Sequence, residues 1–144
     1  MKNHVYIPAG KGDNYNYSQD HCFIKLSSND TNGELCFVED TLKPGFHLGR
    51  HHHKIMTEVF YMLEGELELI FDDETVTLRP GDTSTVPPQV WHEAKCEEGG
   101  KMLTIFKYGR FVLYLEKLSR LTDNDFTDSA LMEKINAEFD IYEG

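Results

Sequence analysis

Three histidines and one glutamate in this chain are spaced like the ligands of a metal ion. His51, His53 and Glu58 share one short stretch, and His92 follows in a second stretch. Imidazole nitrogens and a carboxylate together suit iron, nickel, manganese, copper and zinc. Such a set leaves coordination positions open on a six-coordinate ion, as chemistry on a bound substrate requires. The sequence therefore predicts one divalent metal ion held by these residues.

Strand geometry explains how these residues can meet. Side chains two positions apart on a strand point to the same face, so His51 and His53 face one way and His52 the other. Glu58 has the opposite parity, which predicts a turn after Lys54 and a neighbouring strand beyond it. His92 must then arrive from a third strand or its loop. The alternative interpretation is a solvated histidine cluster, but the spaced glutamate and glycine that follow it favour a metal site.

The elements that would position these ligands are short strands. Apolar runs rich in Val, Ile, Phe, Tyr and Thr are separated by turn residues, a pattern typical of an antiparallel sandwich or barrel. The turns include Glu64-Gly65 and Pro80-Gly81. The runs cover residues 35–38, 46–48, 59–63, 67–71, 75–78, 83–86 and 103–107.

The two ends of the chain differ from this middle part. The N-terminal part reads as an irregular arm, with one short strand around residues 5–7. Apolar residues at three-to-four spacing from Phe111 to Leu121 predict a helix, and a second short helix follows, capped by Thr127 or Asp128. Both helices are expected to cover the outside of the barrel. The expected organisation is an arm (1–34), a β-barrel (35–108) and a helical tail (109–144).

Length and charge limit the class of protein. A chain of 144 residues fits one domain. A net charge of −11 disfavours binding to nucleic acid or to an anionic membrane surface. The odd number of cysteines suggests reduced thiols, and neither a leader nor a long apolar run is visible. The sequence therefore predicts a cytoplasmic protein.

The spacing of two motifs resembles the cupin superfamily. In the first motif Gly45, His51, His53, Glu58 and Gly65 fall at the family's positions. In the second motif Gly81, Pro87 and His92 match, whereas Gln89 replaces a glycine and Cys96 an asparagine. The similarity covers roughly residues 35–108, and the joint match of these spaced residues is highly specific. Neither departure falls on a ligand position.

The resemblance implies a fold and a function. The fold would be all-β, an antiparallel double-stranded β-helix or jelly-roll barrel, with C-terminal α-helices. The ligand set and the helical tail are similar to single-domain cupins of the quercetin dioxygenase-like group. In that group the residues matching His51, His53, Glu58 and His92 hold a divalent metal. Glu58 would also act as a general base toward a substrate hydroxyl.

Several other residues are candidates for substrate contact. Parity from Glu58 points Phe60 inward, and Trp91 lies next to the fourth ligand. His47 shares parity with His51 and is a further candidate for the cavity wall. Cys96 lies four positions after His92 and reads either as a ligand or as a small buried residue.

Three functions fit this reading. The first is a metal-dependent oxygenase acting on a small organic substrate. The second is a non-oxidative isomerase or lyase on a sugar or keto acid, in which the metal only polarises a carbonyl. The third is a non-catalytic small-ligand-binding protein. Because a barrel of this kind leaves an exposed sheet edge, which proteins usually cover, a homodimer is also predicted.

Overall fold

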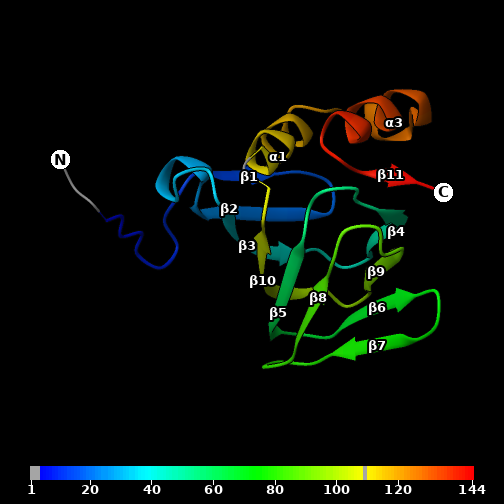
Figure 1. Cartoon of the computed structure of the whole chain (residues 1–144), viewed down its shortest axis with the longest axis horizontal. Coiled ribbons are helices and arrows are strands. Elements are labelled where there is room, and N and C mark those ends of the chain that lie inside the picture. Colours follow the sequence, from blue (N-terminus) through cyan, green and yellow to red (C-terminus); the bar gives the residue numbers. More distant parts are fainter. Residues whose placement is uncertain (1–3, 109) are drawn as a thin grey trace.

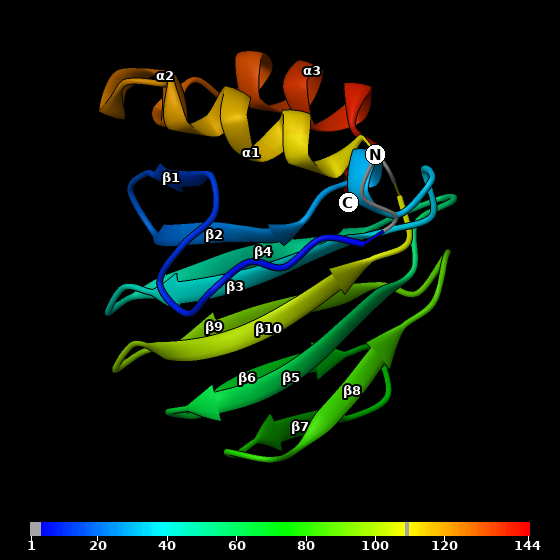
Figure 2. The same cartoon turned by 90° about the vertical axis from the view of Figure 1, so that its left-hand side faces the viewer.

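The computed structural model describes residues 4–108 and 110–144 and shows two antiparallel sheets packed face to face, with helices at one end (Figures 1 and 2). The first sheet has the order β1-β2-β3-β10-β5-β8 and the second β11-β4-β9-β6-β7. This confirms the predicted all-β jelly-roll with C-terminal helices. The strands of the first sheet are Asn14–Asn16, Asp20–Leu26, Cys36–Leu42, Gly100–Phe106, Glu58–Glu64 and Thr83–Val86. Those of the second are Tyr142–Glu143, Phe46–His52, His92–Cys96, Leu67–Phe71 and Thr75–Leu78.

The core lies between the sheets and follows strand alternation. Along β5, Phe60 and Met62 are buried, whereas Tyr61 between them is 43% exposed. On β10, Met102 and Phe106 point inward in the same way. Burial of alternate apolar side chains on both sheets stabilises the barrel, because each removes apolar area from water. The inward direction predicted for Phe60 is therefore correct.

The N-terminal arm contributes more structure than the sequence predicted. The expected strand at residues 5–7 is wrong, because these residues form no strand and Tyr6 is 80% exposed. Instead β2 pairs with β3 along its length, and β1 pairs with β2 at the sheet edge. Residues 1–3 and residue 109 lie outside the described residues. The first sheet thus extends well beyond the apolar run that begins at residue 35.

Helices α1 (Phe111–Ser119), α2 (Asp123–Thr127) and α3 (Ser129–Glu138) lie together over one end of the sheets (Figure 2). The predicted cap is confirmed at Asp128, whose side chain accepts a hydrogen bond from the Leu131 N–H. Helix α2 was not predicted, although its cap Thr122 forms a reciprocal capping box with Asp125. No helix in the described part of the chain is long and apolar enough to cross a membrane.

Candidate metal centre and cavity

The four predicted ligands come from facing sheets. His51 lies on β4 and His53 just after it, and His92 opens β9, which pairs with β4 so that His51 and His92 are direct partners. Glu58 opens β5 in the opposite sheet, rather than on a strand bonded to β4. The chain between His53 and Glu58 therefore crosses from one sheet to the other, which is the turn that the parity of Glu58 required.

The ligand atoms converge in a buried position. All four residues are at most 6% exposed, and one nitrogen or oxygen atom from each lies within 4.8 Å of the others. Two ligands on opposite sides of an ion are about 4.2 Å apart, given bond lengths near 2.1 Å. The cluster His51, His53, Glu58 and His92 therefore fits one metal ion in size as well as in chemistry.

Each imidazole is held by a hydrogen bond to a backbone carbonyl. The Nδ1 atoms of His51, His53 and His92 lie 2.7, 2.7 and 3.0 Å from the carbonyl oxygens of Gly49, Asp140 and Val90. A carbonyl oxygen only accepts, so each Nδ1 carries the hydrogen and each Nε2 keeps a lone pair. This is the tautomer that a metal ligand needs, and the outer hydrogen bond fixes the orientation of the ring.

Two of these lone pairs have no hydrogen-bond donor. The Nε2 atoms of His53 and His92 are buried and have no hydrogen-bond partner among the described residues. His53 Nε2 is 2.7 Å from Glu58 Oε1, yet the pair lacks hydrogen-bond geometry. Buried polar atoms without partners cost free energy and call for an explanation. Adjacent ligands of one ion, which approach each other without a hydrogen bond between them, provide that explanation.

Burial and mutual charge shift the titration of these groups. Burial, helped by the nearby His92, lowers the pKa of His51 to about 4. Burial likewise lowers the pKa of His92. For His53 the effect of burial is outweighed by Glu58, which raises the pKa of this imidazole. Burial alone would raise the pKa of Glu58, but His53 and the other two imidazoles lower it. A neutral His51 and His92 beside an ionised carboxylate is the state that binds a divalent ion.

Asp140 organises the crossing between the sheets, and sequence reasoning missed it. Its carboxylate accepts hydrogen bonds from the backbone N–H groups of Lys54, Ile55 and Met56 at 2.9, 2.9 and 2.8 Å. Its own carbonyl accepts from His53 Nδ1, and its backbone has a φ of 64°. One buried residue from the C-terminal segment therefore holds both a ligand and the turn that leads to Glu58. No motif marks it, because a single aspartate after a helix reads as an ordinary turn residue.

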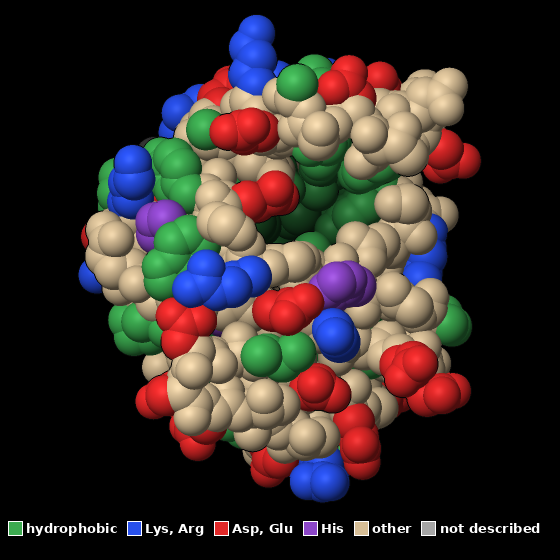
Figure 3. Space-filling model, turned by 90° about the vertical axis from the view of Figure 1, so that its right-hand side faces the viewer, with side chains coloured by type: hydrophobic (Ala, Val, Ile, Leu, Met, Phe, Trp, Pro, Cys, Tyr) green, Lys and Arg blue, Asp and Glu red, His purple; other side chains and the backbone are tan. Residues whose placement is uncertain are grey.

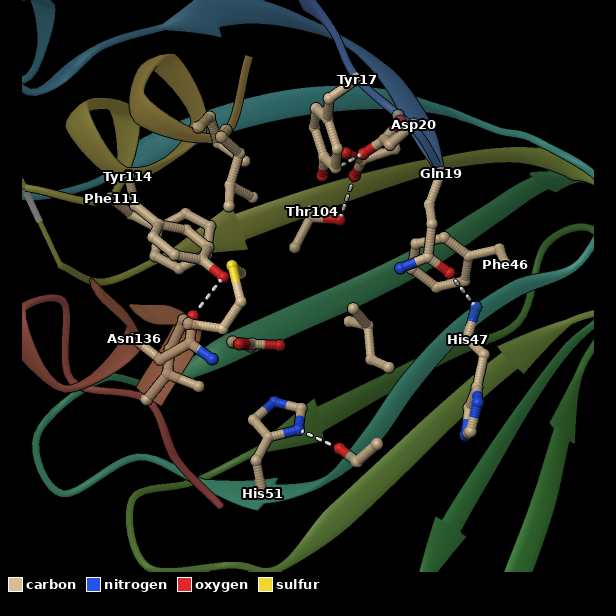
Figure 4. Close-up of a pocket in the computed structure, with 18 of the residues that line it drawn as sticks. Tyr17, Gln19, Asp20, Phe46, His47, His51, Thr104, Phe111, Tyr114 and Asn136 are labelled. Atoms are coloured by element: carbon tan, nitrogen blue, oxygen red, sulfur yellow. Dashed lines mark hydrogen bonds between the residues drawn. The ribbon is translucent and has the colours of Figure 1, made fainter. Parts of the chain in front are cut away.

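A cavity of about 440 Å³ extends from the ligands toward the helices. Figure 3 shows its mouth as a hollow with hydrophobic side chains inside and charged side chains on the rim. His51, His53 and Glu58 line one side, and apolar groups such as Phe60 and Met102 line the wall. The tail was expected only to cover the outside of the barrel, but Tyr114, Met132 and Asn136 from its helices close the cavity (Figure 4).

The other candidate residues have different positions. His47 lies at the rim and is exposed, with its Nε2 2.5 Å from Glu93 Oε2. The parity argument for His47 was wrong, because the register of β4 shifts between Leu48 and His51, so Phe46 points inward instead. Trp91 packs its ring against His52 and under Arg50, on the outer side of β4.

Both departures from the cupin motifs have a structural account. Gln89 adopts a φ of 72°, the left-handed conformation that a glycine reaches without strain, so the turn before His92 keeps its form. Its backbone N–H donates to the carbonyl of His53 at 2.7 Å. Cys96 is 1% exposed and belongs to the apolar core, with burial raising the pKa of its thiol. A small buried residue, rather than a ligand, matches this position.

Comparison with known proteins agrees with this architecture. A family profile described as "Cupin domain" matches residues 38–106. These residues form a cupin domain. The region contains all four residues of the cluster, so the family resemblance drawn from the two motifs is confirmed.

One curated relative of this cupin is quercetin 2,3-dioxygenase from Bacillus subtilis, strain 168. It is 26% identical over 113 residues, which cover 78% of this chain but 34% of the relative. The chain thus matches about a third of the length of that protein. Because the identity is low and the coverage partial, this relative supports the family but does not fix the reaction.

Two solved structures show the same fold. The structure of KdgF from Halomonas sp. has a TM-score of 0.65 at 19% identity, covering 76% of this chain and 97% of that one. An RmlC-like cupin from Shewanella frigidimarina NCIMB 400 has a TM-score of 0.63 at 23% identity, covering 78% and 96%. At these identities the likeness concerns the fold alone.

Proposed function

We propose that this cupin is a metal-dependent oxygenase that acts on a small organic substrate. The observation that carries the proposal is the set of four buried ligand atoms at the wall of a cavity, including two Nε2 atoms without partners. The relationship to a quercetin dioxygenase supports the oxidative reaction. The donor set of three nitrogens and one oxygen suits iron, nickel, manganese, copper or zinc.

The residues that line the cavity would have different roles in the reaction. His51, His53, Glu58 and His92 would hold the ion, which supplies a Lewis acid and, for a redox-active metal, electron transfer. Glu58 is the candidate general base, because its carboxylate lies at the cavity wall and is kept ionised by the imidazoles around it. It would take the proton of a substrate hydroxyl. Phe60 would pack against the substrate body, and His47 would meet a polar group at the rim.

A non-oxidative isomerase or lyase on a sugar or keto acid is the second candidate. The observation that favours it is a pair of buried carboxyl groups, Asp20 and Asp40, in the wall of the cavity that Glu58 also lines. Carboxyl groups at two places in one cavity can move a proton from one substrate atom to another without any change in oxidation state.

Metal content and oxygen consumption test the proposal. Protein purified without added metal is analysed for its elements, and then reloaded with iron, nickel, manganese, copper or zinc. Oxygen uptake is measured with flavonols and small enols. The oxygenase proposal predicts uptake only with redox-active ions. Turnover with zinc and without oxygen supports the isomerase or lyase instead. Tight binding of these compounds without turnover in any loaded form indicates a ligand-binding protein.

Glu58→Gln separates metal binding from base catalysis. Gln keeps an oxygen that can face the ion but cannot take up a proton at neutral pH. We expect the variant to retain some metal and to lose at least about 100-fold in turnover, the range of a general base. His52→Gln is the control, since His52 lies on β4 beside the ligand His51 but packs against Trp91 on the outer side of that strand. Unchanged turnover in Glu58→Gln would contradict the assignment of Glu58.

We also propose that the chain forms a homodimer through the outer face of the first sheet. Tyr61, Leu103 and Ile105 form a shallow apolar groove there with neighbouring side chains, next to the edge strand β8. A second copy would cover both the groove and the edge, which otherwise invite non-specific pairing. Light scattering measures the mass in solution, and Tyr61→Glu should reduce it to that of a monomer, whereas Lys95→Glu on the other sheet should not. A monomeric wild-type protein would exclude this interface.

A further inference from the structure

We propose that Asp20 and Asp40 form a second binding subsite of the cavity, which accepts an ammonium or hydroxyl group of a ligand bound at the metal centre. The proposal rests on the proposed function, since it places the other end of the same ligand at the metal. Figure 4 shows Asp20 and Thr104 across the cavity from His51. Asp20 opens β2 and Asp40 lies on β3, and both are buried to the extent of the metal ligands.

Few hydrogen bonds fix the two carboxyl groups. Asp40 Oδ2 accepts from the Thr104 hydroxyl at 2.6 Å, and Asp20 Oδ2 accepts from the Tyr17 hydroxyl at 3.3 Å. Asp20 Oδ1 is buried and, apart from the carboxyl group of Asp40, no side chain or backbone group of the described residues bonds to it. Asp20 is 3% exposed and lines the cavity. A buried carboxyl group with a spare acceptor at a cavity wall is a place where a ligand donor improves the hydrogen bonding.

Burial favours protonation of the pair at neutral pH. Burial, with the charge of Asp40 next, raises the pKa of Asp20 to about 11. Burial raises the pKa of Asp40 as well, although its hydrogen bond with Asp20 opposes this rise. The charge of Lys43 lowers the pKa of Asp20, whereas the charges of Glu58 and Glu39 raise the pKa of Asp40. Burial, followed by the charges of Asp20 and Asp40, raises the pKa of the nearby Cys22 thiol. Two hydrogen-bonded carboxyl groups of this kind can share one proton, and in the proposed subsite the pair keeps one negative charge.

This charge selects the chemistry of the ligand. The oxygens not engaged in the shared proton can only accept hydrogen bonds, so the partner must be a donor. A single negative charge in a buried place favours an ammonium group most, tolerates a hydroxyl group and repels a carboxylate or phosphate. The wall between the two ends carries Phe46 and Phe60, which suit an apolar or aromatic body. The cavity therefore fits a small molecule with a metal-binding oxygen at one end and a cationic or hydroxyl donor at the other.

Infrared spectroscopy of the metal-free protein tests the shared proton. At about pH 8 an ordinary aspartate is ionised, so a carbonyl band of a protonated carboxyl group marks the pair. We expect the band in the wild type and in Glu39→Gln, whose side chain lies on the outward-facing parity of β3. It should be lost in Asp20→Asn and in Asp40→Asn, which retain the shape of a protonated carboxyl group. A wild type without the band overturns the proposal.

Three catechols then test the subsite with the zinc-loaded protein, so that no oxidation occurs. Dopamine, ethylcatechol and dihydroxyphenylacetate share the metal-binding end and carry an ammonium, a methyl and a carboxylate group at the other. Calorimetry should show dopamine binding about tenfold tighter than ethylcatechol, as expected for one charge-assisted hydrogen bond, and dihydroxyphenylacetate weakest. In the double variant Asp20→Asn/Asp40→Asn, which carries no charge there, the preference for dopamine should disappear, while Glu39→Gln should retain it.

The outcomes separate this inference from the proposed function. Equal binding of dopamine and ethylcatechol to the wild type means that the pair only links β2 to β3, and it overturns the subsite while the metal centre stands. If none of the catechols binds to zinc-loaded protein, the metal offers no open position. That result contradicts the proposed function and removes the ligand on which the subsite depends.

Discussion

At the metal-site end of the cavity each imidazole donates its Nδ1 hydrogen to a backbone carbonyl and turns a bare Nε2 inward. At the other end Asp20 and Asp40 instead bond to Thr104, Tyr17 and each other. Both groups are buried. The imidazole nitrogens have lone pairs that can bind a cation, whereas a proton bound to the carboxyl pair partly neutralises its negative charge. The same cavity thus offers a place for a metal ion at one end and for a hydrogen-bond donor at the other.

The difference shows how burial can be used in opposite ways. Desolvation lowers the pKa of His51 to about 4, so protons do not compete with a metal there at neutral pH. Desolvation raises the pKa of Asp20 to about 11, so a proton is retained there at neutral pH. Desolvation therefore keeps His51 unprotonated at the metal-site end and keeps Asp20 protonated at the acidic end.

Removal of a metal ligand should have the largest effect. His92→Ala removes the Nε2 lone pair that would bind the ion. Metal affinity should fall by more than about 100-fold, which exceeds the loss seen when a residue that only supports a ligand is replaced. Titration with zinc followed by calorimetry measures this loss. His52→Ala, on the outer side of β4, is the control and should bind zinc normally. Equal zinc affinity in His92→Ala and the wild type would show that the four residues do not bind the ion together.

Asp140→Ala should have the next effect, because it breaks the support of the metal-site end without touching a ligand. Three backbone N–H groups lose their acceptor. Outer residues of this kind change metal affinity by about 10- to 100-fold. Asp140→Asn, which keeps one acceptor oxygen, should lose less. Asp128→Ala removes the cap of α3 and is the control: it should cost about 1 kcal/mol of stability with unchanged zinc affinity.

The acidic end predicts a pH dependence of stability. Asp20 has a pKa of about 11 in the folded protein against an ordinary value of 3.8, so between these values the folded state binds more protons than the unfolded state. The free energy of unfolding must then fall as pH rises, by up to about 1.4 kcal/mol per pH unit for one group. Asp20→Asn cannot titrate and should show a flatter profile, becoming the more stable protein at high pH.

Denaturant unfolding of the metal-free protein between about pH 5 and pH 9 measures this slope. Metal is omitted because its own binding depends on pH. Glu39→Gln serves as the reference, since it changes one charge on β3, the strand of Asp40, outside the buried pair. Parallel profiles for Asp20→Asn and the wild type would show that the carboxyl pair does not hold an extra proton.

The sequence predicted the two ends unequally, and the reason is physical. His51, His53, Glu58 and His92 fit one ion, and such a site demands fixed residue types at fixed strand positions, so their spacing is visible in the chain. Asp20 and Asp40 meet because β2 pairs with β3, a fact of register that leaves no motif. Asp140 reaches the metal-site end from the far end of the chain, after three helices. Contacts made by tertiary packing alone cannot be read from local pattern.

Parity arguments had a limit of the same kind. They placed Phe60 and Tyr61 correctly, because β5 is regular where it pairs with β8. They failed for His47, because the register shift between Leu48 and His51 changes the phase of β4. A bulge of this type adds one residue to a strand, and the sequence indicates it less clearly than it indicates a turn. Most strands between residues 35 and 107 were therefore predictable from composition, whereas the direction of a side chain was predictable only within an unbroken ladder.

Gln89→Gly should have the smallest effect and tests how closely the metal-site end follows its family. The φ of 72° at Gln89 strains an L-residue by about 1–2 kcal/mol, and glycine removes this strain. Glycine also gains freedom in the unfolded chain, which offsets about 0.5–1 kcal/mol. The net result should be a gain in stability of less than about 1 kcal/mol by denaturant unfolding, with unchanged zinc affinity. Gln89→Ala keeps the strain and should show no gain, so a glycine variant less stable than the alanine variant would mean that the turn before His92 is not strained.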